Sequence, residues 1–204
     1  MKSKNVFLIF LIFLFLNDIY ADEHISIGLD KKNRDCENIT RDTLTERSFS
    51  SDFAGTFNGK RIEYTASLKE KIIYEKDNPD LPMASFFYTE YIAKNNNQRP
   101  VIFSFNGGPG SASLWLHMGV LGPKVIKVPS DASDDGSPPY KIIDNKLSPL
   151  SDADLVFIDP VGTGYSRAIG CHEGEEFWGV SEDPKIIAEF IRRWITDNKR
   201  WNSP

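Results

Sequence analysis

The chain has 204 residues and carries 24 Lys and Arg against 29 Asp and Glu, a formal net charge of −5 at pH 7. This acidic balance argues against nucleic acid or an anionic membrane as a partner, and the length is enough for one domain with a buried core. The three histidines, His24, His117 and His172, form no metal-ligand pattern. The sequence also has no dinucleotide or phosphate-loop motif, so we expect neither a metal nor a cofactor.

Residues 1–21 have the pattern of a secretory signal peptide. Lys2 and Lys4 precede an apolar run over 6–16, and Ala21 ends a plausible cleavage site. The run is shorter than the roughly 20 residues that span a bilayer. We therefore expect a secreted or periplasmic protein that leaves the membrane after cleavage, with an uncleaved N-terminal anchor as the alternative.

Residues 22–51 are polar, mixed in charge and without apolar periodicity, which predicts a flexible leader before a folded domain over 52–204. The chain has two cysteines, Cys36 and Cys171. In an exported protein they either form one disulfide or remain as two thiols, and the spacing does not decide between these. Asn38-Ile39-Thr40 is a glycosylation sequon if the source is eukaryotic.

The first part of the folded region predicts antiparallel strands. Asn58-Gly59 favours a type I′ hairpin turn that joins a strand over 53–57 to one over 61–68. Residues 72–74 continue this sheet. The aromatic, partly alternating run over 83–93 predicts a further antiparallel strand.

The second part predicts parallel strands and helices. Two apolar runs, 101–105 and 155–158, are typical of strands buried on both faces. Between them we expect a short helix over 113–118, a strand over 124–128 and a loop over 130–139. A final helix is expected to have Asp183 as its N-cap and Pro184 as its first residue. One face of this helix is apolar and is expected to cover the sheet. The residues of that face are Ile186, Ile187, Phe190, Ile191, Trp194 and Ile195. The fold class is therefore α/β, with an antiparallel hairpin region leading into a parallel sheet.

A glycine-rich turn, Asn106-Gly107-Gly108-Pro109-Gly110, directly follows the first apolar strand. Glycines allow a ligand to approach the backbone closely, and backbone amides in such a turn can stabilise a developing negative charge on an oxygen. An ordinary tight turn is the alternative. The second motif, Asp159 to Arg167, starts where the other apolar strand ends, and open α/β sheets bind ligands at that edge.

The segments 106–123 (NGGPGSASLWLHMGVLGP) and 154–167 (DLVFIDPVGTGYSR) together resemble the serine carboxypeptidase family of α/β-hydrolases, most of all its bacterial branch. The resemblance covers about residues 52–204. It implies that the amide of Gly108 donates to the oxyanion and that Asn106, with Gly107, holds the terminal carboxylate of a peptide or protein substrate. It also implies a nucleophilic serine in a Gly-Glu-Ser-Tyr-Gly turn, with the acid and the histidine later in the chain.

Two positions depart from the pattern of the better-known eukaryotic members. Ser111 stands where they have a disulfide-bonded cysteine, and Val120 stands where they have a glutamate that assists carboxylate recognition. Because valine cannot hydrogen-bond to a carboxylate, strict specificity for chain ends is not expected.

The triad residues are absent from the 204 residues, since no Gly-x-Ser-x-Gly sequence occurs. Ser111, Ser113 and Ser166 lie in or beside the two motifs, but a rebuilt triad with His117 or His172 is not expected. We expect a fragment that ends before the nucleophile and is inactive alone, with 101–105 as an exposed, aggregation-prone edge strand.

Two other functions remain open. One is a different α/β-hydrolase, an aminopeptidase or esterase, although those place histidine rather than Asn106 before the glycines. The other is a non-catalytic protein that binds peptide ends. The sequence does not define the oligomeric state.

Overall fold

The computed structural model describes residues 39–94, 98–107, 110–128 and 138–204. The signal peptide, Cys36, Gly108 and most of the 130–139 loop lie outside these ranges. Everything below concerns the unit of residues 37–204.

The strands are β1 (Ser48–Phe57), β2 (Lys60–Tyr74), β3 (Pro82–Ala93), β4 (Val101–Ser104), β5 (Lys124–Ile126), β6 (Ile142–Asp144), β7 (Asp154–Ile158) and β8 (Arg167–Ala168). The helices are α2 (Leu114–Leu116) and α3 (Glu182–Asp197). Shorter turns are η3 (Arg41–Thr43), the π-turn η4 (His117–Leu121), η5 (Pro149–Ser151) and η6 (Gly174–Phe177).

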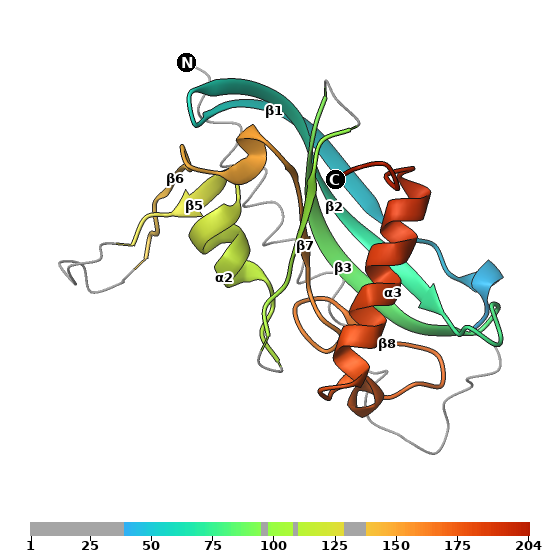
Figure 1. Ribbon diagram of the computed structural model, residues 1–204. Coiled ribbons are helices and arrows are strands. Elements are labelled where there is room, and N and C mark those ends of the chain that lie inside the picture. Colours follow the sequence, from blue (N-terminus) through green and yellow to red (C-terminus); the bar gives the residue numbers. More distant parts are fainter. Residues whose placement is uncertain (1–38, 95–97, 108–109, 129–137) are drawn as a thin grey trace. The chain divides into compact units, whose positions relative to one another are not determined.

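The main sheet has the strand order β1-β2-β3-β7-β4, and β8 pairs with β3 (Figure 1). The pairs β1–β2, β2–β3 and β3–β7 are antiparallel, whereas β4 and β7 are parallel, with Val101 opposite Asp154 and Ser104 opposite Phe157. The chain is thus a mixed α/β protein with a multi-stranded sheet. Among the described strands, β4 ends this order.

The hairpin at Asn58-Gly59 is confirmed. Both residues have positive φ angles, 47° and 78°, as a type I′ turn requires, and Phe57 pairs with Lys60 across it. The predicted continuation through Tyr74 is also confirmed, because β2 runs without a break to that residue.

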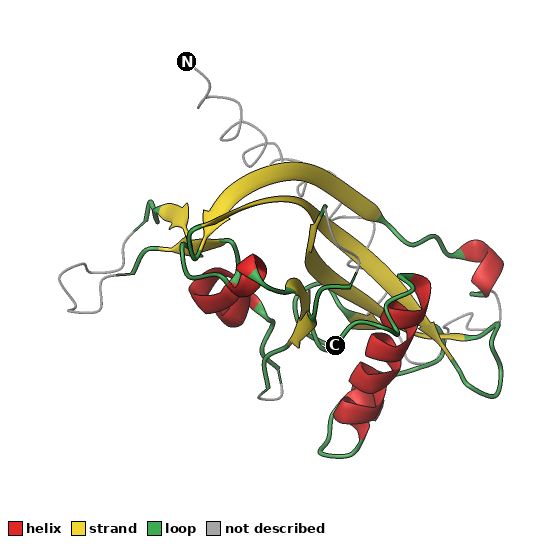
Figure 2. Ribbon diagram, turned by 45° about the horizontal axis from the view of Figure 1, so that its top comes forward, coloured by secondary structure: helices red, strands yellow, loops and turns green. Residues whose placement is uncertain are grey.

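Two apolar layers cover opposite faces of the sheet, because successive side chains of β7 point to alternate sides. Val156 and Ile158 pack with one face of α3, where Ile186, Phe190 and Trp194 are buried. On the other face, Leu155 and Phe157 pack against residues of η5, α2 and η4. The two views agree that α3 and α2 lie on opposite sides of the sheet (Figures 1 and 2). The predicted apolar face of the last helix is therefore confirmed as core.

The start of α3 differs from the prediction. The helix begins at Glu182, after Ser181, so Asp183 is not the N-cap and Pro184 is its third residue. The amide of Asp183 already donates to Gly179 O at 3.2 Å, which places Asp183 inside the first turn. Proline is tolerated there, because amides of the first turn have no partner within the helix.

Other bounds also differ. The expected strand over 124–128 ends at Ile126 and pairs with β6, a strand that the sequence did not predict. The helix expected over 113–118 is a single turn, α2, that continues as the π-turn η4. At the N-terminal side, β1 begins at Ser48, so the last residues of the expected polar leader are in the sheet.

Candidate functional site

The two sequence motifs lie side by side at the carboxyl ends of β4 and β7. These strands are parallel neighbours, so the glycine turn after Ser104 and the loop after Ile158 leave the sheet at the same edge. This is the edge where α/β sheets bind ligands. Asn106 and Gly107 are described there, whereas Gly108, the expected oxyanion donor, lies outside the described residues.

Ser113 joins the glycine turn to the end of β7. Its side chain is only 2% exposed. The Ser113 hydroxyl donates to Ile158 O. It also accepts a long hydrogen bond of 3.4 Å from the backbone amide of Asn106. The Ser113 amide donates to Asp159 Oδ1 at 2.8 Å. This hydroxyl is therefore committed to a backbone carbonyl and is not poised as a nucleophile.

Ser166 plays a similar role on the other side of Asp159. Its hydroxyl donates to Asp159 O at 2.7 Å and accepts from the Phe87 amide at 2.8 Å, which connects the loop to β3. The side chain of Ser166 is fully buried. Ser166 is thus a second bridging serine rather than a candidate nucleophile.

Asp159 sits between Ser113 and Gly164. A Cβ atom built on Gly164, which has a φ of 51°, would lie 2.1 Å from Asp159 Oδ2, so any side chain there would displace the carboxylate. Burial raises the pKa of the Asp159 carboxyl, and the hydrogen bond from the Ser113 amide offsets this only in part. The glycine at 164 is required by this close approach.

Asn106 contains an unsatisfied group. Its Oδ1 is buried and accepts no hydrogen bond from any described residue. A buried acceptor without a donor costs free energy, and such groups in folded proteins call for an explanation. Next to it Gly107 is exposed, and a Cβ there would contact nothing within 4 Å, so the turn is open to an approaching molecule.

The two described histidines lie in different surroundings, and the hydrogen bonds of neither involve Ser111, Ser113 or Ser166. His117 Nε2 is 2.6 Å from the Tyr91 hydroxyl, and its ring stacks on Phe157. Burial lowers the pKa of His117 to about 4, so this imidazole is neutral at pH 7.

His172 lies between two carboxylates. Its Nε2 is 2.8 Å from Glu75 Oε1 and its Nδ1 is 2.8 Å from Glu176 Oε2. Burial alone would lower the pKa of His172, but the hydrogen bonds to Glu176 and Glu75 outweigh it and raise the pKa. Cys171 beside it is exposed, and the choice between a disulfide with Cys36 and two thiols stays open because Cys36 lies outside the described residues.

Sequence reasoning missed the hydrogen bond between Asp159 and Ser113. One signal was present, since Asp159 directly follows a buried strand, but its partner is 46 residues away in the chain. The surface exposure of two apolar side chains that follow the glycine turn in the sequence was also not predicted. Trp115 is 71% exposed and Val120, the position of the family glutamate, is 59% exposed.

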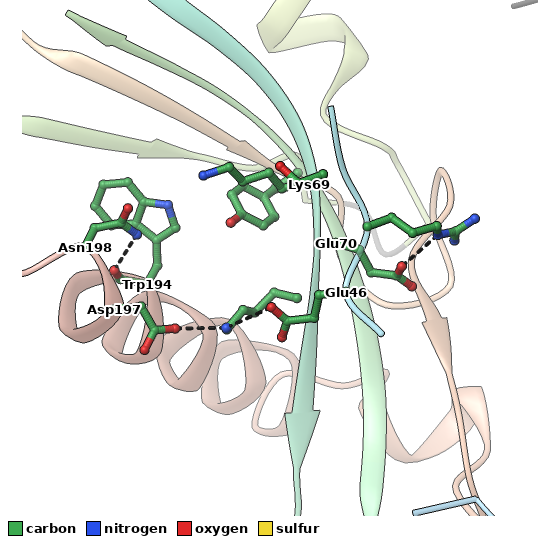
Figure 3. A pocket seen from close by; sticks show the side chains of 10 residues that line it. Glu46, Lys69, Glu70, Trp194, Asp197 and Asn198 are labelled. Carbon is green, nitrogen blue, oxygen red and sulfur yellow. Dashed lines mark hydrogen bonds and ion pairs between the residues drawn. The ribbon is translucent and has the colours of Figure 1, made fainter. Parts of the chain in front are cut away.

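Two hollows on the described residues are lined by residues other than those of the glycine turn. One, of about 260 Å³, lies between β2 and the end of α3, where Lys71 forms ion pairs with Glu46 and Asp197 (Figure 3). The other, of about 670 Å³, is lined by Tyr74, Met83, Phe177 and residues of α3. The charged groups of the first hollow are largely paired with one another. We assign neither hollow a ligand.

Within the described ranges, no three His, Cys, Asp or Glu side chains gather in a way that could hold a metal ion. Likewise, none of the helices described here has the length and apolar character to cross a bilayer.

Comparison with known proteins gives consistent matches. The family model for serine carboxypeptidases matches residues 74–203. The pheromone-processing carboxypeptidase KEX1 of Saccharomyces cerevisiae (strain JAY291) is 36% identical over 102 residues, which are 50% of this chain and 12% of that protein. Serine carboxypeptidase-like 5 and 9 of Arabidopsis thaliana are 26% and 29% identical over 121 and 119 residues. In each plant protein the match covers 58% of this chain and 26% of the relative. The chain thus spans only a small part of the length of these relatives.

Proposed function

The chain belongs to the serine carboxypeptidase family, and on that premise we propose that it supplies the substrate-holding and oxyanion part of a serine-type carboxypeptidase. The reaction of the whole enzyme is hydrolysis of a peptide bond through an acyl-enzyme, with release of the C-terminal residue. The substrate is a peptide or protein, and the fold is the N-terminal part of an α/β-hydrolase domain over 52–204.

We assign the roles to the glycine turn. The amide of Gly108 donates to the oxyanion that forms on the scissile carbonyl, and Asn106 with Gly107 holds the end of the peptide. The buried, unpartnered Oδ1 of Asn106 is the observation that carries this assignment. In this assignment the Nδ2 group of Asn106 donates to the terminal carboxylate, which has no donor of its own, and a peptide N–H would satisfy the buried Oδ1. The exposed Gly107 leaves room for the peptide to approach.

The chain by itself is proposed to be hydrolytically inactive. Attack on a carbonyl needs an activated nucleophile with a base in hydrogen-bond reach. Ser113 and Ser166 donate to backbone carbonyls instead, and the 204 residues contain no Gly-x-Ser-x-Gly turn. The acyl-transfer step therefore needs groups that these residues do not supply.

Further properties are proposed from the sequence pattern. The N-terminal 21 residues direct export, which gives a secreted or periplasmic protein, and Ser111 in place of cysteine favours the bacterial branch. The exposed apolar Val120 cannot pair with a carboxylate, so preference for a free chain end is expected to be weak rather than absolute.

The test is binding of two blocked dipeptides that differ only at the end, one with a free carboxylate and one with a carboxamide. Calorimetry should show binding of the acid by the chain and its loss in Asn106→Ala. As a matched control, Asn198→Ala changes an exposed asparagine at the end of α3 and should bind normally. Equal affinity of Asn106→Ala and the unmodified chain for the acid would contradict the assignment.

A non-catalytic protein that binds peptide ends is the second candidate, favoured by the commitment of both bridging serines to backbone carbonyls. A fluorophosphonate probe, which labels activated serines, separates the two when it is applied to the protein isolated from its source organism. Labelling supports the hydrolase. Peptide binding without labelling supports the binding protein.

A further inference from the structure

In the described residues, the glycine turn is connected to β7 through Ser113. The described hydrogen bonds that connect the turn to its surroundings include the 3.4 Å bond from the Asn106 amide to Ser113 Oγ. Ser113 is in turn fixed twice, by its hydroxyl to Ile158 O and by its amide to Asp159 Oδ1. The position of Asn106 therefore depends on a side chain seven residues later and on a carboxylate at the end of another strand.

These bonds continue into the sheet. The main-chain oxygen of Asp159 accepts from the Ser166 hydroxyl, and the Asp159 amide donates to Phe87 O at 3.1 Å. The Asp159 backbone is thus anchored to β3 while its side chain holds Ser113. Oδ2 of Asp159 occupies the space that a Cβ at 164 would need, so the glycine allows the carboxylate to lie beside Ser113.

We propose that Ser113 and Asp159 are positioning residues that set the location of Asn106 and the entry of the glycine turn relative to β7. This rests on the proposed function, because it assigns the two residues to the peptide-holding site. Neither touches the peptide. Each acts through Asn106, whose buried Oδ1 has to meet a ligand donor within hydrogen-bond distance.

Two substitutions of Asp159 test this, one that keeps an acceptor for the Ser113 backbone amide and one that removes it. Asp159→Asn keeps an oxygen that can accept from the Ser113 amide, whereas Asp159→Ala removes it. Ser113→Ala removes the acceptor for the Asn106 amide and the donor for Ile158 O. Ser67→Ala is the matched control, because Ser67 is also a buried serine with a hydroxyl contact, to Ser50, but lies in β2.

The first measurement is amide hydrogen exchange of the full chain, which does not depend on any ligand. Loss of one hydrogen bond should speed exchange about tenfold at Ser113 in Asp159→Ala and at Asn106 in Ser113→Ala. Core amides of β2 and β3 should keep their rates, which shows that the variants remain folded. Unchanged exchange at Asn106 and Ser113 in both variants would overturn the proposal.

The second measurement is the affinity for the blocked dipeptide with a free carboxylate. Asp159→Ala and Ser113→Ala should bind about tenfold more weakly, Asp159→Asn should recover most of the affinity, and Ser67→Ala should not change it. A merely stabilising role predicts equal binding once each variant is folded, and that result would also overturn the proposal. If the unmodified chain does not bind the dipeptide, the proposed function fails, and the exchange rates still decide whether Ser113 and Asp159 position the turn.

Discussion

The two ends of strands β4 and β7 are built in opposite ways. At the amino end, Asp154 is fully buried, and both of its carboxylate oxygens accept hydrogen bonds. Its Oδ1 accepts from the Ala93 amide and from Arg99, and its Oδ2 accepts from Arg200 at 2.8 Å. At the carboxyl end, the glycine turn meets the loop after Ile158. There Asn106 Oδ1 is buried without a partner among the described residues, and burial raises the pKa of Asp159.

This difference separates stability from function within one sheet. The amino end closes the structure, because Arg200 also donates to Arg99 O and so ties the segment after α3 to the start of β4. The carboxyl end tolerates unfavourable burial of polar groups. Local rules of protein structure are most often broken at functional sites, which agrees with the placement of the proposed peptide site at this end.

The largest effect is expected from Asp154→Ala. The substitution leaves Arg99 and Arg200 without their buried acceptor, and loss of one partner of a buried ion pair costs about 3–5 kcal/mol. Urea unfolding measures the change. Asp152→Ala is the control, because Asp152 forms an exposed pair with Lys60 and should have no measurable effect. Equal stability of the two variants would remove the distinction between the two ends.

The next effect is a pH dependence that comes from His117, which packs on β7 near the carboxyl end. Its pKa in the folded chain is about 4, below the ordinary 6.5, so its contribution to stability is full above pH 6.5 and is lost as the pH falls toward 4. The size over this window is about 2–4 kcal/mol. Unfolding of the chain and of His117→Phe at pH 7 and pH 4.5 measures it, and the variant should lack this part of the pH dependence.

His172 gives the opposite sign and serves as the comparison. Its pKa is raised in the folded chain, so its contribution is full below 6.5 and is lost as the pH rises through the folded value. The loss of stability caused by His172→Gln, relative to the unmodified chain, should therefore be larger at pH 6 than at pH 9. His117→Phe should not show this difference. If both variants changed in the same direction between acid and alkaline pH, the assignment of their surroundings would be wrong.

These contrasts also show how much the sequence could predict. Asn58-Gly59 predicted its hairpin because only a few residues accept positive φ, and the apolar face of α3 followed from helical spacing. The strand β6 was missed because Ile142, Ile143 and Asp144 are exposed and carry no alternation, so the pairing with β5 alone defines it.

At the site, the two motifs meet because β4 and β7 are parallel neighbours, a pairing that the sequence did not predict. The contacts between them were not predictable. The bond from Ser113 to Asp159 and the clearance between Gly164 and Asp159 depend on side-chain placement across different elements, for which the sequence carries no period or spacing signal. The roles of Asn106, Gly107 and Gly108 stay predictions.

A smaller effect is expected from Asn106→Ala, and it has the unusual sign. Removal of a buried, unpartnered acceptor should leave the free energy of unfolding unchanged or raise it by up to about 1 kcal/mol, while peptide binding is lost. Thermal and urea unfolding beside calorimetric binding measure both. A loss of stability as large as that of Asp154→Ala would mean that Asn106 is a structural residue like those of the amino end.

The smallest effect is expected from Asp159→Asn, which tests the carboxyl end through its ionisation. Because burial raises the pKa of Asp159, the folded chain disfavours the charged form, and the contribution of this group to stability is present at low pH and lost as the pH rises through the folded value. Asparagine cannot ionise but still accepts from the Ser113 amide.

The variant should therefore be slightly more stable than the unmodified chain at pH 7, and the gain should vanish below pH 3.8, where Asp159 is protonated in the unfolded chain too. Urea unfolding of both proteins at the two pH values measures the gain. A variant that is less stable at pH 7 would show that the carboxylate charge itself holds Ser113. The carboxyl end would then be stabilised by a charged carboxylate, as the amino end is by Asp154.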